Sequence, residues 1–287
     1  MTILAIDAGT TGVTALLVSR DARVVAKGYS EFPQHFPADG WVEHDPNEIW
    51  AATLASVEQV LNSPAIAEHG APTAVGITDQ RETIVLWDRE TLGSARMAIV
   101  WQDRRTAGFC DQLKADGHED RVRELTGLRL DPYFSATKLS WIKKQEPNVW
   151  AGVESGRTAI GTIDSYLIAR MTRGVTHVTD ASNASRTLLF DINTGEWSQE
   201  LCDLFGVPIE ALPEIVPSYG TVGTTDPSTF AGLELPIAGI AGDQQAALFG
   251  QACFDVGSSK CTYGTGSFVL VNTGDKIVRS DAGLLST

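Results

Sequence analysis

The chain has 287 residues, 43% of them hydrophobic, which suffices for one large domain or a large domain with part of a second. Its 36 acidic residues outnumber 22 basic ones, and the resulting net charge of −14 argues against nucleic-acid binding. No apolar run approaches the roughly 20 residues that span a bilayer, so we expect no membrane insertion and a cytoplasmic location. The four cysteines lack metal-ligand spacing and are expected to be reduced thiols.

Three strands are predicted at the start of the chain, over residues 2–7, 13–18 and 24–29. Apolar residues dominate the first two, and a glycine- and threonine-rich turn over residues 8–12 joins them. Short turns between consecutive strands favour antiparallel pairing, so we expect the sheet to begin as an antiparallel meander.

The first helix is predicted to begin beside Asp45. Asp45 can cap the free amides of the first turn, Pro46 suits the first helical position, and Glu48 completes a capping box. The apolar residues that follow recur at helical spacing and predict a buried face made of Ile49, Leu54, Val57 and Leu61.

Strands and helices alternate through the rest of the chain, which predicts an α/β fold. Further strands are expected at 74–78, 83–87, 98–101 and 237–241, and helices at 104–115, 137–144 and 165–171. Residues 260–272 repeat the opening plan of strand, glycine–threonine turn and strand. We therefore expect a first domain over residues 1–250 and, over residues 251–287, only the first hairpin of a second, truncated domain.

Two glycine- and threonine-rich loops, over residues 7–12 and 263–267, are candidate phosphate-binding segments. The first joins two strands and lacks the lysine of a Walker motif. Its amides and threonine hydroxyls could approach an anion, and Asp7 could hold a hydrated magnesium ion. The first loop alone is more typical of an ordinary hairpin turn, and the second alone is ambiguous, whereas a cleft lined by both could bind a polyphosphate from two sides.

Asp243 stands where an apolar strand passes into a helix. One interpretation is a helix N-cap. The other is a general base, because ligands of α/β folds collect at the carboxyl ends of strands. Phosphoryl transfer to an alcohol needs a carboxylate that accepts the hydroxyl proton. Position alone leaves both interpretations open.

Arg81 and Glu82 follow the strand predicted to end at residue 78. They suit a surface ion pair worth less than about 1 kcal/mol, but also a donor fork and an acceptor for neighbouring hydroxyls of a polyol. Trp101, Tyr133 and Phe268 could wall a small site around a carbon skeleton. Each of these aromatic residues, taken alone, is more typical of a place in the core.

Eight segments together carry a resemblance to a known family. They are residues 7–11, 40–46, 76–83, 100–106, 131–138, 178–187, 239–251 and 262–266. The adjacent Arg81 and Glu82 and the Asp-Gln-Gln-Ala-Ala-Leu-Phe-Gly run from Asp243 are the most specific of these features. In content and order, the segments resemble the sugar and polyol kinases of the FGGY family, and within it the glycerol kinases.

The resemblance implies a fold of two ribonuclease H-like domains, as in actin, hexokinase and Hsp70. Each domain would have a mixed sheet flanked by helices, with the active site in the cleft between the two domains. It also implies ATP-dependent phosphorylation of glycerol to sn-glycerol 3-phosphate with Mg²⁺ as the metal. Relatives form dimers or tetramers, so a homo-oligomer is expected.

The resemblance assigns a role to each candidate site residue. Asp243 would be the general base, and Arg81, Glu82 and Tyr133 would join it in binding the glycerol hydroxyls. Trp101 and Phe268 would cover the glycerol carbons, and Gln244 would bind the substrate and also line the phosphate path. The ATP phosphates would contact Thr10, Thr11, Gly264 and Thr265, with Asp7 near the magnesium ion.

Three departures from the family pattern bear on activity. Ala8 stands where glutamine is usual, and Thr14 where a basic residue is common, so the hold on the phosphates is expected to be weaker. Family members are nearly twice as long, and the remainder should carry the adenosine pocket. We therefore expect little or no activity from these 287 residues alone. The alternatives are an FGGY kinase for another polyol or a pentose, and a non-catalytic polyol-binding fragment.

Overall fold

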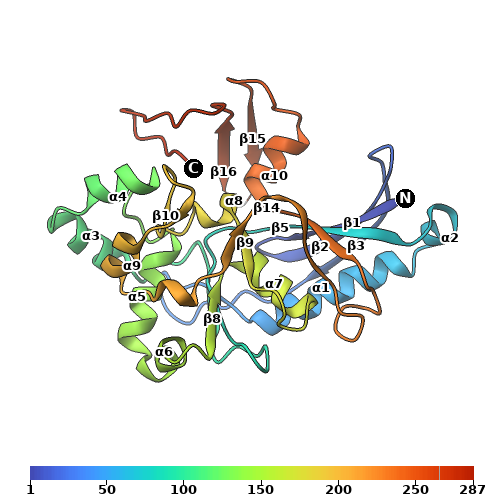
Figure 1. Ribbon diagram of the computed structural model, residues 1–287, viewed down its shortest axis with the longest axis horizontal. Coiled ribbons are helices and arrows are strands. Elements are labelled where there is room, and N and C mark those ends of the chain that lie inside the picture. Colours follow the sequence, from blue (N-terminus) through green and yellow to red (C-terminus); the bar gives the residue numbers. More distant parts are fainter. Residues whose placement is uncertain (265) are drawn as a thin grey trace.

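A six-stranded mixed sheet forms the centre of the computed structural model, which describes residues 1–264 and 266–287 (Figure 1). The strand order is β13 (Tyr219–Thr224), β14 (Pro236–Gly242), β5 (Pro72–Asp79), β1 (Thr2–Ala8), β2 (Gly12–Ser19) and β3 (Val24–Glu31). The strands β14, β5 and β1 are parallel, and the remaining neighbours are antiparallel. The predicted α/β class with a mixed sheet is confirmed, as is the opening meander β1–β2–β3.

Helices surround this sheet and build a second lobe beside it (Figure 1). They are α1 (Pro46–Leu61), α2 (Ala65–His69), α3 (Ala107–Ala115), α4 (Glu119–Thr126), α5 (Ser135–Gln145), α6 (Pro147–Glu154), α7 (Ile163–Met171), α8 (Ala181–Ala184), α9 (Gln199–Phe205), α10 (Asp243–Gly250) and the 3₁₀ helix η1 (Ile209–Ala211). Among the described residues, no helix combines the length and apolarity that crossing a bilayer requires.

The start of α1 agrees with the sequence in one respect and differs in another. The Asp45 carboxylate accepts a hydrogen bond from the Asn47 amide at 2.8 Å, as expected of an N-cap. The predicted capping box is wrong, because Glu48 instead contacts His35 Nε2 at 2.9 Å. The backbone of His35 pairs with Glu43, which holds the imidazole within reach of the helix.

The buried face of α1 lies partly where the sequence predicted it. Ile49 and Val57 are fully buried against the sheet. Leu54 and Leu61 are only partly buried, because the helix turns Trp50, Thr53 and Val60 toward the strands instead.

Short two-stranded pairs complete the secondary structure. They are β4 (Glu43–His44) with β7 (Ala98–Ile99), β6 (Val85–Asp88) with β8 (Thr158–Gly161), β9 (Val178–Asp180) with β12 (Glu214–Val216), β10 (Phe190–Asp191) with β11 (Glu196–Trp197), and β15 (Ser259–Tyr263) with β16 (Ser267–Val271). The strands predicted at 83–87 and 98–101 therefore exist in shortened form and lie outside the main sheet.

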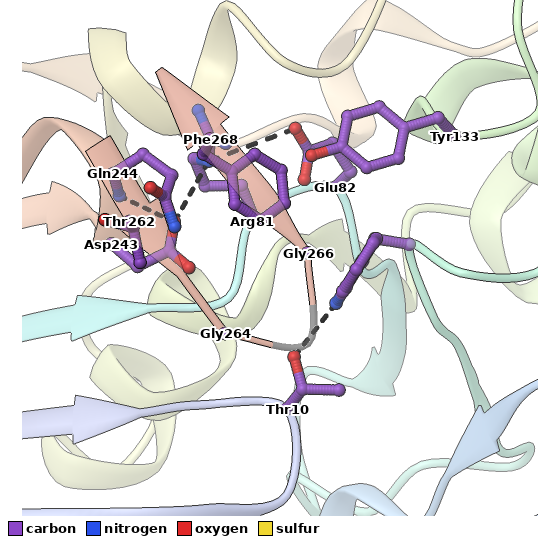
Figure 2. A pocket seen from close by; sticks show the side chains of 11 residues that line it. Thr10, Arg81, Glu82, Tyr133, Asp243, Gln244, Thr262, Gly264, Gly266 and Phe268 are labelled. Carbon is purple, nitrogen blue, oxygen red and sulfur yellow. Dashed lines mark hydrogen bonds and ion pairs between the residues drawn. The ribbon is translucent and has the colours of Figure 1, made fainter. Parts of the chain in front are cut away.

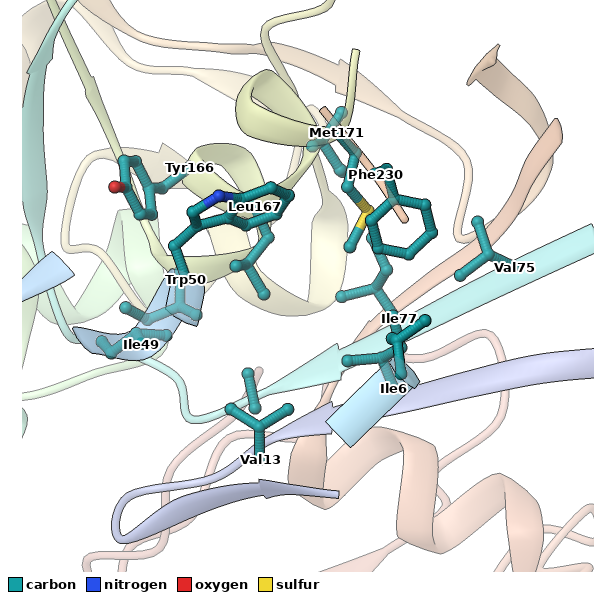
Figure 3. Close-up of a cluster of buried hydrophobic side chains, with 14 of the residues drawn as sticks. Ile6, Val13, Ile49, Trp50, Val75, Ile77, Tyr166, Leu167, Met171 and Phe230 are labelled. Atoms are coloured by element: carbon teal, nitrogen blue, oxygen red, sulfur yellow. The ribbon is translucent and has the colours of Figure 1, made fainter. Parts of the chain in front are cut away.

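Two hydrophobic clusters stabilise the molecule. One fills the space between the central sheet and helices α1 and α7, where Ile6, Ile77, Trp50 and Phe230 meet (Figure 3). The other joins helices α3 to α6 and α9. Neither cluster includes a residue of the β15–β16 hairpin, which stands above the sheet in Figure 1.

Candidate active site at the carboxyl edge of the central sheet

The three parallel strands β14, β5 and β1 open onto the same edge of the sheet, because their carboxyl ends point the same way. Asp79, at the end of β5, pairs with Ala8 on one side and with Gly242 on the other. Arg81 follows two residues after β5, and Asp243 begins α10 directly after β14. The fold thus gathers the polar segments that follow these strands, as expected for an α/β protein.

A cavity of about 170 Å³ lies at this edge, between the sheet and the β15–β16 hairpin (Figure 2). Its walls consist of charged, hydroxyl and aromatic side chains and of glycine residues, whose backbone is not covered by a side chain. They are Thr10, Arg81, Glu82, Trp101, Tyr133, Asp243, Gln244, Thr262, Gly264, Gly266 and Phe268. The cavity is smaller than the pockets of about 300–1,000 Å³ that hold drug-sized ligands, so it suits a small molecule.

Arg81 is the central cation of the cavity and is only 4% exposed. Its Nε lies 3.1 Å from the Asp243 carboxylate and 4.0 Å from Glu82. Its Nη1 donates to Gln245 Oε1 at 3.1 Å. Gly242 makes this placement possible, because a Cβ there would lie 2.6 Å from Arg81 Cδ. The guanidinium is thereby fixed between two acids, in contrast to the surface pair that the sequence alone allowed.

Glu82 is buried and has a left-handed backbone, with φ at +64°. Such a conformation in a residue other than glycine carries strain of about 1–3 kcal/mol and requires support from its surroundings. Arg186 Nε donates to its carboxylate at 2.7 Å, and the Ser135 hydroxyl donates to its carbonyl at 3.0 Å. The strained residue thus presents a carboxylate to the cavity with one oxygen already bound by Arg186.

Asp243 is the first residue of α10 and is not its N-cap, a position that Gly242 holds. Its carboxylate accepts a hydrogen bond from the Gln244 amide at 2.7 Å and lines the cavity. Burial raises the pKa of Asp243, and the charge of Glu82 adds to this, while Arg81 opposes it. A raised pKa makes the carboxylate a stronger base, which suits proton abstraction.

Asp7 is the last acidic residue of β1 before the first loop, and it is exposed. Loss of hydration and, to a smaller extent, the negative charge of Asp243 together raise the pKa of Asp7 to about 6. No cluster of three or more histidine, cysteine, aspartate or glutamate side chains in the described residues has the geometry of a metal site. Mg²⁺ usually takes only one or two carboxylates together with water and phosphate oxygens, so Asp7 fits a partial ligand set.

Aromatic rings close the sides of the cavity. Trp101 packs edge-on against Tyr133, with 5.7 Å between ring centroids, and against Phe268 at 6.1 Å. Its indole Nε1 donates to Thr10 Oγ1 at 2.9 Å, which joins the first loop to this wall. Gly266 leaves room for Phe268, since a Cβ there would lie 2.7 Å from the ring.

Tyr133 supplies the hydroxyl of this wall. Burial raises the pKa of Tyr133, and the charge of Glu82 adds to the increase. The phenol therefore stays protonated at neutral pH and can donate a hydrogen bond to a ligand.

The structure brings together most of the residues singled out in the sequence. The nine that line the cavity are Thr10, Arg81, Glu82, Trp101, Tyr133, Asp243, Gln244, Gly264 and Phe268. Asp7 and Thr11 do not line it, and Thr11 is exposed on the first loop. Thr265 lies outside the described residues.

Gly266 lines the cavity and belongs to the second glycine-rich loop singled out in the sequence. Two other contributors to the site have no signal strong enough to assign them from sequence. Thr262 lines the cavity, and Arg186 binds Glu82 from 104 positions away. Arg186 is the one charged residue in the run 181–187, and that isolated charge among small polar residues could have drawn attention to it.

Comparisons with known proteins agree with this architecture. The model of the FGGY family of carbohydrate kinases, N-terminal domain, matches residues 2–250. A glycerol kinase from Methylobacterium nodulans is 54% identical over 285 residues, which are 99% of this chain and 56% of the relative. The crystal structure of Plasmodium falciparum glycerol kinase with ADP superimposes with a TM-score of 0.92 at 36% identity, covering 99% of this chain and 56% of that one.

A more distant structure supports the fold alone. Xylulose kinase from Rhodospirillum rubrum has a TM-score of 0.86 at 24% identity, over 94% of this chain and 55% of that one. The chain thus spans little more than half the length of the relatives it matches. On the family match over residues 2–250, the chain belongs to the FGGY family of carbohydrate kinases and contains its N-terminal domain.

Proposed function

We propose that this chain supplies the polyol-binding and general-base part of an ATP-dependent kinase that converts glycerol to sn-glycerol 3-phosphate. The observation that carries the proposal is the convergence of Arg81, Glu82, Tyr133 and Asp243 in one small cavity with aromatic walls. Hydroxyl groups need both donors and acceptors, and this set offers both. The glycerol kinases among the relatives support the same substrate.

Asp243 is the proposed general base. It would accept the proton of the glycerol hydroxyl that becomes phosphorylated, and its raised pKa favours that transfer. Arg81, at 3.1 Å, would keep the carboxylate oriented while leaving its second oxygen free for the substrate. Glu82 and Tyr133 would hold the remaining hydroxyls, and Trp101 and Phe268 would pack against the carbons.

The phosphoryl donor would approach along the two glycine-rich loops. When bound, MgATP would supply the phosphoryl group and neutralise charge as the group is transferred. The hydroxyls and amides of Thr10, Thr11, Gly264 and Thr265 would contact its phosphates, with Asp7 beside the Mg²⁺ ion. We also propose that a domain boundary lies near residue 250 and that the protein forms a homo-oligomer. A cytoplasmic location is consistent with the four free cysteine thiols, because the cytoplasm keeps thiols reduced.

Calorimetric titration of the chain with glycerol tests the substrate assignment. We expect glycerol to bind the wild-type chain and Asp243→Ala to weaken that binding about tenfold or more, as expected for the loss of a charged hydrogen-bond partner. Asp255→Ala, which changes an exposed residue after α10, is the matched control. Erythritol and xylulose in the same titrations test the alternative substrates. Tighter binding of either, or no binding of glycerol, contradicts the assignment.

A further inference from the structure

Lys260 is a buried cation next to the cavity that the proposed mechanism does not use. It extends from β15, is 3% exposed, and does not line the cavity itself. Its ammonium donates to Gln244 Oε1 and to Thr262 Oγ1, the latter at 2.7 Å, and both partners line the cavity. Within the described part of the chain it forms no ion pair with a carboxylate. A buried lysine without a carboxylate partner calls for a specific explanation.

The two hydrogen bonds fix which groups face the ligand. An ammonium group only donates, so it selects the carbonyl oxygen of the Gln244 amide and leaves the NH₂ group on the other side. In the described residues that nitrogen has no hydrogen-bond partner, and Gln244 lines the cavity. The Thr262 oxygen likewise accepts from Lys260, so its own hydrogen remains available. The Gln244 amide and the Thr262 hydroxyl can each donate or accept, and the contact with Lys260 leaves both of them to act as donors.

We propose that Lys260 is a positioning residue that holds the Gln244 amide with its nitrogen toward the ligand, where it donates to an oxygen of the bound polyol. This inference rests on the proposed function, since it deepens the account of the same site. It also explains why a cation stands behind the cavity wall without touching the ligand. If Lys260 served only to link α10 to the hairpin, it would not matter whether the oxygen or the nitrogen of the Gln244 amide faces the cavity.

Nuclear magnetic resonance of the ligand-free chain tests the amide orientation directly. The Gln244 side-chain NH₂ signals are identified by their absence in Gln244→Leu. We expect Lys260→Met to shift or broaden these signals, because the amide is then free to turn over, and Lys260→Arg to preserve them, because arginine also only donates. Lys27→Met, an exposed change on β3, is the matched control. Unchanged Gln244 signals in Lys260→Met would overturn the inference.

Glycerol titration of the same variants tests the consequence for binding. We expect Lys260→Met and Gln244→Leu each to weaken glycerol binding about tenfold, and the double variant to be no weaker than either single one, because both remove the same donor. Full additivity of the two losses would contradict the inference. If the wild-type chain does not bind glycerol, the proposed substrate is wrong, and the resonance comparison still decides the role of Lys260. If Lys260→Met does not fold, Lys260→Gln replaces it in the test. A glutamine at this position can offer either a donor or an acceptor to Gln244, so we expect two populations of Gln244 signals. A single, unshifted population would overturn the inference.

Discussion

At the scale of single residues, Asp79 is a buried carboxyl group with incomplete hydrogen bonding. It is fully buried at the end of β5, and its Oδ1 accepts from Asn183 Nδ2 at 3.1 Å. Its Oδ2 and the Asn183 Oδ1 have no partner among the described residues. Burial raises the pKa of Asp79 well above its usual value, and the charges of Asp164, Asp243 and Asp180 add to this. We infer that the carboxyl is protonated in the folded chain.

The first prediction concerns the effect of Asp79 on stability. Because its pKa is higher in the folded state than in the unfolded state, folding takes up a proton, so stability falls as pH rises above about 4. Asp79→Asn keeps the shape without the titration, and should be more stable than wild type at pH 8 by about 1 kcal/mol or more. Urea unfolding at pH 5 and pH 8 measures this, with the exposed Asp39→Asn as control. Parallel pH profiles for wild type and Asp79→Asn would show that Asp79 is ionised in the fold.

Lys138 is a second buried titratable residue, and it supports the wall of the site from the side away from the cavity. It lies in α5 with no exposed surface, and its ammonium donates to the carbonyls of Pro132, Tyr133 and Phe134 at 2.7, 2.7 and 2.9 Å. These three carbonyls belong to the segment that turns Tyr133 into the cavity. The lysine therefore stabilises the conformation of a cavity wall.

We predict that Lys138→Met lowers the unfolding free energy by about 2–4 kcal/mol, because it removes the donor that three buried or partly buried carbonyls share. It should also speed hydrogen exchange of the amides in residues 131–135 more than elsewhere, which mass spectrometry of the exchanged chain can measure. Lys143→Met, in the same helix but exposed, is the control and should change exchange only near Gly206. Equal exchange rates in both variants would contradict this role.

At the scale of elements, local sequence patterns predicted what depends on neighbours in the chain. The meander, the cap at Asp45 and the strand-to-helix passage at Asp243 follow from residues within a few positions of one another. The short helices α4, α6 and α9 were not predicted, because two turns hold too few apolar residues for a periodic pattern. Glu48 was assigned to the wrong partner because His35, 13 positions away, competes for it.

The same limit applies to the site. Arg81, Glu82 and Asp243 were found because their motifs are contiguous, whereas the support from Arg186 spans 104 positions. Lys260 and Lys138 look like ordinary exposed lysines in the sequence, since nothing local tells that their side chains are buried. Contacts between distant segments decide burial and partners, and one sequence alone does not reveal them.

The β15–β16 hairpin contributes residues to the cavity but none to either hydrophobic cluster. Thr262, Gly264, Gly266 and Phe268 line the cavity, yet the hairpin is absent from both hydrophobic clusters. We predict that a chain ending at residue 250 stays folded, with an unfolding free energy lowered by less than about 2 kcal/mol, and no longer binds glycerol. Urea unfolding and calorimetry measure the two effects.

A matched variant separates the hairpin from the residues that follow it. Phe268→Ala in the full chain removes one wall only and should weaken glycerol binding while leaving stability close to wild type, since Phe268 is only partly buried. A chain of residues 1–250 that fails to fold would show that the segment after α10 is needed for stability, contrary to the position of the two cores.

At the scale of the whole molecule, a high net charge is combined with a group of exposed apolar side chains. The chain carries a net charge of −14. A group of exposed apolar side chains gathers on α10, the following loop and the hairpin, and comprises Phe249, Phe254, Val256, Tyr263, Val269 and Val271. The hairpin is a separate two-stranded sheet, so both of its outer edges are unpaired.

The net charge and the exposed apolar side chains together determine whether two molecules of the chain repel or attract each other in solution. At low ionic strength the like charges of two molecules repel over a distance of about 30 Å at 0.01 M salt, which keeps the apolar hairpin faces apart. At 1 M salt the distance over which the charges repel shrinks to about 3 Å. The exposed apolar side chains of two molecules can then come into contact. We predict that the second virial coefficient from static light scattering changes sign from positive to negative as salt is added. Val269→Lys combined with Val271→Glu should keep it positive, and a salt response that these changes leave unaltered would place the attraction elsewhere on the surface.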